Sequence, residues 1–157
     1  MGDDDLHAVE RWAGALLSRL QPSQRRRINQ LIAQELRRSQ AKRIAAQLAP
    51  DGSAYPARKQ RKLVEKKGRI KRQKQQMFSK LRTATWLKIE TSEHELAVGF
   101  LGRVARIARV HQEGLEDKVD RRGPRYKYPA RQLLGFPATD REFIRDVLLR
   151  HVSPSKT

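Results

Sequence analysis

The chain has 157 residues, a formal net charge of +18 and no cysteine. The missing cysteines exclude disulfides and thiolate metal sites, and the length allows one domain with a modest core. The sequence pI of about 11.2 indicates anionic partners. No apolar run approaches the ~18 to 20 residues that span a bilayer, so we expect no membrane partner.

Two consecutive helices are predicted first. Residues 6–20 carry apolar side chains at helical spacing, from Leu6 to Leu20. Pro22 suits the first turn of a second helix, which we expect over residues 22–48 with a narrower apolar stripe beginning at Ile28. A tight connection makes residues 6–48 a helical hairpin. The second helix is long for a domain of this size, so we expect part of it to project or to pack on another subunit.

A basic loop or arm is predicted for residues 50–76, after the turn signal of residues 49–53. Between residues 58 and 74 the only acid is Glu65, and so many cations need solvent or an anionic surface. The segment contains no aromatic residue for base stacking, which weakens a base-reading role. Ten cations are candidates for contact with an interface or an anionic partner: Arg58, Lys59, Arg61, Lys62, Lys66, Lys67, Arg69, Lys71, Arg72 and Lys74.

Residues 77–152 are expected to form an α+β body. Apolar alternation predicts strands over residues 85–91 and 96–101, joined by a hairpin loop at residues 92–95. A short helix is expected over residues 104–112 with Gly114 as its C-terminal cap. Residues 115–127 are polar and are interpreted as a surface excursion, and residues 128–136 as an extended segment. A last helix is expected from Thr139, capped with Glu142, to residue 152.

The predicted fold class is therefore α+β, in a single domain of residues 1–157. It combines an N-terminal helical hairpin, a small antiparallel sheet, a C-terminal helix and a basic extended loop.

No constellation of catalytic residues is found in the sequence. The glycines lack nucleotide-loop spacing, the four histidines lack metal-ligand spacing, and no nucleophile motif is present. His111 is interpreted as a packing histidine bonded to nearby backbone. Trp12 and Trp86 are interpreted as core or interface anchors. Residues 25–27 are three arginines that either contact phosphates or form a solvated helix face. We expect no enzymatic activity and no cofactor.

Five segments in order carry a resemblance to a known family. They are residues 22–27, 49–52 with Tyr55, 77–81, 107–114 (IARVHQEG) and 128–136 (YPARQLLGF). Together they resemble the phage virion morphogenesis family, the tail-completion proteins of contractile-tailed phages. Two positions depart from the family pattern: Gln132 replaces a proline, and Glu113 replaces an apolar or aromatic residue.

The resemblance implies a structural virion protein that completes the tail and enables head–tail joining. By analogy we expect a homo-hexameric ring at the tail end or neck, contacting tail tube and neck or connector proteins after assembly in the host cytoplasm. The structural residues that it implies are His111, Gly114, Pro129, Arg131 and Gly135. Pro129 and Gly135 would fix the extended segment and its turn. Arg131 would either pair with a carboxylate, within the chain or across an interface, or pack over Tyr128.

Three interpretations of the basic segment remain. It is an arm that orders on an acidic neighbouring protein, a channel lining that contacts DNA phosphates, or a solvated loop. The alternative function for the whole chain is a basic nucleic-acid-binding protein that acts through phosphate contacts.

Overall fold

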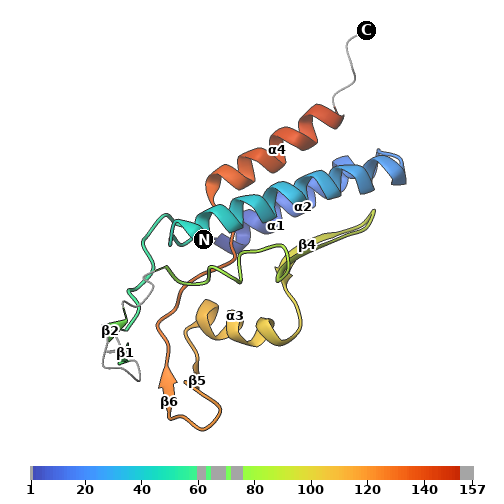
Figure 1. The fold of residues 1–157 in the computed structure, drawn as a ribbon. Helices are drawn as coiled ribbons and strands as arrows, with labels where there is room; N and C mark the ends of the chain where they lie inside the picture. The colour runs from blue at the N-terminus through green and yellow to red at the C-terminus, as the bar shows by residue number, and fades with distance from the viewer. Residues whose placement is uncertain (1, 60–62, 65–69, 72–75, 153–157) are drawn as a thin grey trace. The chain divides into compact units, whose positions relative to one another are not determined.

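The computed structural model describes residues 2–59, 63–64, 70–71 and 76–152, with side chains for residues 6–59 and 76–152. This part of the chain holds four helices and three two-stranded sheets (Figure 1). In chain order the elements are α1 (Gly2–Leu17), α2 (Pro22–Ala45), β1 (Leu63–Val64), β2 (Ile70–Lys71), β3 (Leu87–Thr91), β4 (Leu96–Phe100), α3 (Arg103–Glu113), β5 (Glu116–Lys118), β6 (Arg125–Lys127) and α4 (Ala138–Val152). The α+β class and the helices at both ends are confirmed.

The chain divides into two compact units of very different charge. The helical unit comprises Met1–Ser39, Ile89–Val98 and Phe136–Thr157, and the basic unit comprises Gln40–Lys88 and Gly99–Gly135. The basic unit contains 24 Lys or Arg and 6 Asp or Glu residues, whereas the helical unit contains 11 of each kind. The entire excess of +18 therefore belongs to the basic unit.

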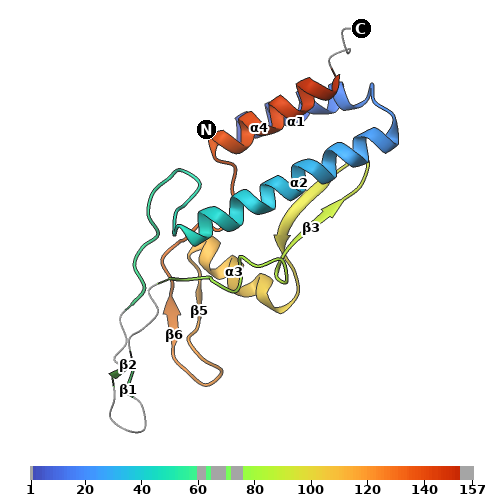
Figure 2. The same cartoon turned by 45° about the horizontal axis from the view of Figure 1, so that its top comes forward.

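The core of the helical unit is built by α2 and α4. Ile28, Ile32 and Leu36 of α2 pack with Val147 and Leu148 of α4, all at most 3% exposed. Apolar side chains around this core come from α1, the turn after α1, β4 and α4: Ala13, Leu17, Leu20, Leu96, Val98, Phe143 and Ile144. Helices α1 and α4 lie side by side (Figure 2).

The apolar stripe of α2 packs within the chain's own helical unit. Ile28 and its neighbours are buried there, because α4 covers them. Leu31 of the same helix is 47% exposed.

Polar side chains of α2 and α4 are paired within the helical unit, among them the buried Asn29 and Asp140. Asn29 Nδ2 donates to the carbonyl of Ser92 at 2.9 Å, which fixes the turn between β3 and β4. Ser39 Oγ donates to Asp140 Oδ1 at 2.6 Å. Asp140 also lies in the first turn of α4, where the helix dipole favours a carboxylate.

The ends of the helices depart slightly from expectation. Helix α1 already begins at Gly2, and α2 ends at Ala45 rather than at residue 48. At the start of α2, Pro22 takes the first position and Gln24 Oε1 accepts from the amide of Gln21 at 3.1 Å, one half of a capping box. Thr139 lies inside α4, so its expected capping role is wrong.

The basic unit has its own core, formed by Ile44, Tyr55, Leu81, Val104, Ala108 and Leu133. Around it lie two hairpins that apolar alternation did not predict. Strands β1 and β2 pair antiparallel inside the expected basic loop, with Val64 opposite Ile70. Strands β5 and β6 pair antiparallel within residues 115–127, with Asp117 opposite Tyr126. The second hairpin was missed because its side chains are mostly polar.

The packing of α4 can be tested with two neighbouring leucines. Leu148 is 1% exposed and Leu149 is 43% exposed. We expect L148A to lower the free energy of unfolding by about 2–5 kcal/mol, because it removes buried contacts and leaves a cavity. The control L149A should cost less than about 1 kcal/mol. Urea unfolding followed by circular dichroism measures both, and equal losses would contradict this packing of α4.

Candidate functional site

The extended segment of residues 128–136 lies outside the strands and helices of the described chain. Its backbone is bound instead by side chains from other parts of the basic unit. The Gln112 amide makes the most contacts: its Oε1 accepts from the amides of Leu133 at 2.7 Å and Leu134 at 2.9 Å, and its Nε2 donates to the carbonyl of Leu134 at 3.0 Å. The side chain of one glutamine thus makes the hydrogen bonds to this backbone that a neighbouring strand would otherwise make.

The end of α2 binds the same segment from a second element. Arg43 Nη2 donates to the carbonyl of Leu133 at 2.7 Å, and its Nη1 donates to the carbonyl of Gln132 at 3.1 Å. Gln40, 4% exposed, donates through Nε2 to the carbonyl of Gly135 at 2.6 Å. The Leu133 side chain between these contacts is fully buried. We call this set of side chains, with Gln112 and Tyr55, the backbone clamp.

Tyr55 completes the clamp from the loop after α2. Its hydroxyl donates to the carbonyl of Gln132 at 3.0 Å, and the residue is 7% exposed. Burial raises the pKa of this phenol, so it remains a donor at neutral pH. The carbonyl of Gln132 is the group used here, and proline at this position would keep it.

Arg131 binds carbonyls rather than a carboxylate. It is 5% exposed, and its Nε and Nη2 donate to the carbonyls of Pro56 at 2.8 Å and Ala57 at 3.0 Å. Its own amide donates to the carbonyl of His111 at 2.6 Å. Two backbone acceptors of its own chain take these donors, and pairing of Arg131 with a carboxylate across an interface stays a prediction.

His111 is part of a ladder of five rings. The order is Tyr55, Phe78, His111, Tyr128 and Tyr126, with successive centroids 5.9, 4.8, 5.0 and 5.0 Å apart in edge-to-face contacts. The packing role of His111 is confirmed. Its expected side-chain hydrogen bond is not seen, because its buried Nδ1 has no partner among the described residues.

The environment of His111 opposes its charged form. Burial, with a smaller contribution from the positive charge of Arg131, lowers the pKa of His111 to about 4. The imidazole is therefore neutral at physiological pH.

Gly114 and Gly135 are required for close approach. Gly114 caps α3 in the left-handed conformation, with φ 67° and its amide donating to the carbonyl of Val110. A Cβ there would also lie 2.9 Å from the backbone nitrogen of Ala130. At Gly135 a Cβ would lie 2.3 Å from Cγ of Pro50. Space against Pro50 explains this glycine, rather than the turn that we expected. Pro129 is half-buried beside Ala130.

The ten candidate cations of the basic segment are only partly described. Arg58 and Lys59 are exposed, and Lys59 Nζ lies 5.1 Å from the ring centroid of Tyr126. Lys71 is in β2, where only its backbone is described. The other seven lie outside the described residues: Arg61, Lys62, Lys66, Lys67, Arg69, Arg72 and Lys74.

Sequence reasoning missed the clamp residues Gln40, Arg43 and Gln112. No sequence motif marks these two glutamines or this arginine. The available signal was spacing, because Gln40 and Arg43 are three residues apart and share a helix face with the buried Ile44.

The site is suited to holding backbone rather than to covalent chemistry. Its hydrogen bonds join side chains to main-chain groups of the same unit. Across the described residues, no cluster of His, Asp or Glu side chains has the geometry of a metal site, and no described helix is long and apolar enough to cross a membrane.

Comparison with known proteins is consistent with these structural roles. The profile of the phage virion morphogenesis family matches residues 4–153. The chain is similar to the tail completion protein S of Escherichia phage P2, with 41% identity over 138 residues, which cover 87% of this chain and 90% of that protein. No solved structure matches the chain.

The close approach at Gly135 can be tested by adding one methyl group. We expect G135A to lower the free energy of unfolding by about 1–3 kcal/mol, because Cβ would overlap the Pro50 ring. The control G14A adds the same methyl group in α1, where nothing lies within 4 Å, and should be neutral or stabilise by up to about 1 kcal/mol. Thermal unfolding of both variants measures the difference, and a G135A variant as stable as wild type would contradict this contact.

The neutral state of His111 predicts how stability depends on pH. In the unfolded chain His111 binds a proton below about pH 6.5, whereas in the folded chain it binds one only below about pH 4. Between these two values protonation favours the unfolded state, so His111 lowers the free energy of unfolding as the pH falls. We expect H111F, which keeps the ring, to lessen that decline by about 1–2 kcal/mol, a figure reduced for the partial exposure of the ring. Urea unfolding at a series of pH values measures it. The control H94Q changes an exposed histidine, and the same change in both variants would overturn the assignment.

Proposed function

Because the chain belongs to the phage virion morphogenesis family, we propose that it is a structural virion protein that completes the phage tail and enables head–tail joining. The observation that carries the proposal is the match over residues 4–153 together with 41% identity to a protein named for tail completion. The match spans both compact units, so it does not rest on one shared motif.

The roles of the family residues support a structural function. His111 packs in the ring ladder, Gly114 and Gly135 allow close approach of two segments, and Arg131 binds main-chain carbonyls. Each of these contacts is a packing contact or a hydrogen bond to the main chain. A protein used as a building block needs such internal rigidity and needs no catalytic group.

We further propose that the chain works as a closed ring of identical subunits, a homo-hexamer at the tail end or neck. Such a ring requires two different complementary surfaces on each subunit. The helical unit offers one apolar candidate, a groove of about 420 Å³ between α1 and α4 that is lined by Ala8, Val9, Trp12 and Ala138. Trp12 is 39% exposed there, and an exposed tryptophan is a common anchor of protein interfaces.

Deletion of the gene from the phage genome that encodes the chain tests the proposed function. We expect filled heads and separate tails in electron micrographs, with infectivity restored by wild-type protein supplied in trans. The P2 relative supplied in the same way is an informative second arm. Normally joined particles in the deletion strain would overturn the proposal.

The ring is tested separately by the mass of the purified chain. Native mass spectrometry should give a closed oligomer, with six copies as the expected state. A chain that stays monomeric at all concentrations, alone and with isolated tails, would overturn the ring while leaving tail completion open to the deletion test.

A further inference from the structure

The net charge of the chain lies entirely in one of its two compact units. The helical unit is neutral by count, and the basic unit carries the whole excess of +18. This division points to a ligand of the basic unit that is itself strongly anionic.

Part of this charge lies on α3 and the β5–β6 hairpin, where the side chains are described. Exposed cations on these elements are Arg103, Arg106, Arg109, Lys118, Arg121, Arg122, Arg125 and Lys127. We call these eight residues the α3–hairpin surface. Six of the eight are arginine, whose planar guanidinium suits phosphate oxygens.

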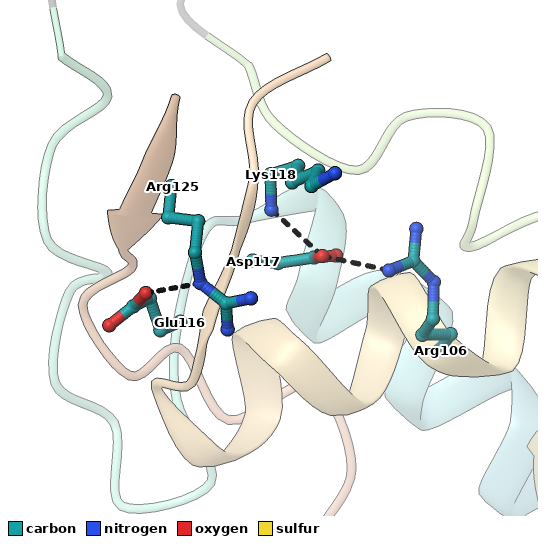
Figure 3. Close-up of polar contacts among 5 residues, drawn as sticks. All are labelled: Arg106, Glu116, Asp117, Lys118 and Arg125. Atoms are coloured by element: carbon teal, nitrogen blue, oxygen red, sulfur yellow. Dashed lines mark hydrogen bonds and ion pairs between the residues drawn. The ribbon is translucent and has the colours of Figure 1, made fainter. Parts of the chain in front are cut away.

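Three of these arginines form ion pairs with nearby carboxylates. Arg106 Nη1 contacts Asp117 Oδ1 at 2.7 Å, and Arg125 Nε contacts Glu116 Oε1 at 2.5 Å; Figure 3 draws both contacts. Arg109 pairs with Glu113 at 3.1 Å along α3. The first contact ties the hairpin to α3, and the second crosses the hairpin. These pairs hold the surface in shape and neutralise three of its acids.

The tip of the hairpin carries cations beyond those pairs. The amide of Gly123 donates to the carbonyl of Asp120 at 3.0 Å, which closes a tight turn with Arg121 and Arg122 at its two central positions. Asp120 accepts from the amide of Arg121 at 2.6 Å, so its carboxylate is engaged within the turn. Two adjacent exposed arginines therefore project from a fixed turn.

The aromatic side chains of the basic unit distinguish between kinds of nucleic acid. Each of its six aromatic residues is described, and each is buried or half-buried. Four of them are in the ring ladder with His111. Single-strand binders expose aromatic rings for base stacking, so this unit is suited to the phosphate backbone of a duplex.

We propose that the basic unit binds the phosphate backbone of double-stranded DNA without regard to sequence, through the α3–hairpin surface. Duplex DNA carries a charge about every 1.7 Å along its axis, which matches a broad surface of arginines better than a local acidic patch does. The inference is independent of the proposed tail function, because it rests on charge and exposure alone.

The test compares two arginine pairs that change the charge equally. R121Q/R122Q removes the pair at the hairpin tip, and R26Q/R27Q removes an adjacent exposed pair of α2 in the neutral helical unit. Binding of the full chain to duplexes of two base compositions is measured across a salt series. We expect wild type to bind both duplexes with a steep salt dependence. The R121Q/R122Q variant should reduce the log–log salt slope by about 2, equally for both sequences, since each phosphate contact contributes about 0.9. R26Q/R27Q should match wild type.

Several outcomes would overturn the inference. One is absence of duplex binding by wild type at about 0.1 M salt. Another is an equal loss in both variants, which would show that only net charge matters. A third is displacement of DNA by poly-glutamate as readily as by competitor duplex, which would indicate an acidic protein as the partner.

The same variants separate this inference from the proposed function. A wild-type chain that restores infectivity to the deletion strain but binds no DNA overturns only the inference. A chain that binds DNA as expected but whose deletion leaves joined particles overturns only the tail function. Neither Arg121 nor Arg122 belongs to the ion pairs drawn in Figure 3. We therefore expect R121Q/R122Q to keep the fold, and circular dichroism checks this.

Discussion

The constraint on which the basic unit depends is the need to satisfy the buried backbone of an extended segment that has no neighbouring strand. Residues 128–136 meet that need through the side chains of Gln40, Arg43, Tyr55 and Gln112, each acting on a main-chain group. An unpaired buried backbone group costs as much as a lost hydrogen bond. The four side chains come from the end of α2, the following loop and α3, so satisfying one segment also fixes the other three.

The same need for backbone partners and packing explains why residues that could take part in catalysis have structural roles here. A histidine beside an arginine in a half-buried setting resembles a catalytic pair, yet His111 packs between two rings and Arg131 donates to carbonyls. Two glycines then allow close approach, because Gly114 lies against Ala130 of the segment and Gly135 of the segment lies against Pro50, at distances that no side chain permits. The residues that the family resemblance singled out are thus ones that keep the polypeptide in one arrangement.

Much of the fold could be predicted from sequence where apolar spacing carries the information. The helices α1, α2, α3 and α4 and the β3–β4 pair follow periodicities of about 3.6 and 2. The Gly114 cap follows from its position after an amphipathic run. The β5–β6 hairpin could not be predicted in this way, because ion pairs such as Arg125 with Glu116 replace apolar alternation there. The backbone clamp could not be predicted either. Its partners lie as much as 95 residues apart in sequence, and its side chains bind main-chain atoms, which are the same in every residue type.

The unequal charge of the two units has a consequence for how copies of this chain meet. Two basic units repel each other over distances of about 10 Å at 0.1 M ionic strength, whereas two neutral helical units do not. At moderate salt, contacts between copies of the chain are therefore more favourable through the helical unit. An arrangement that brings several basic units close together requires an anionic partner or a high salt concentration.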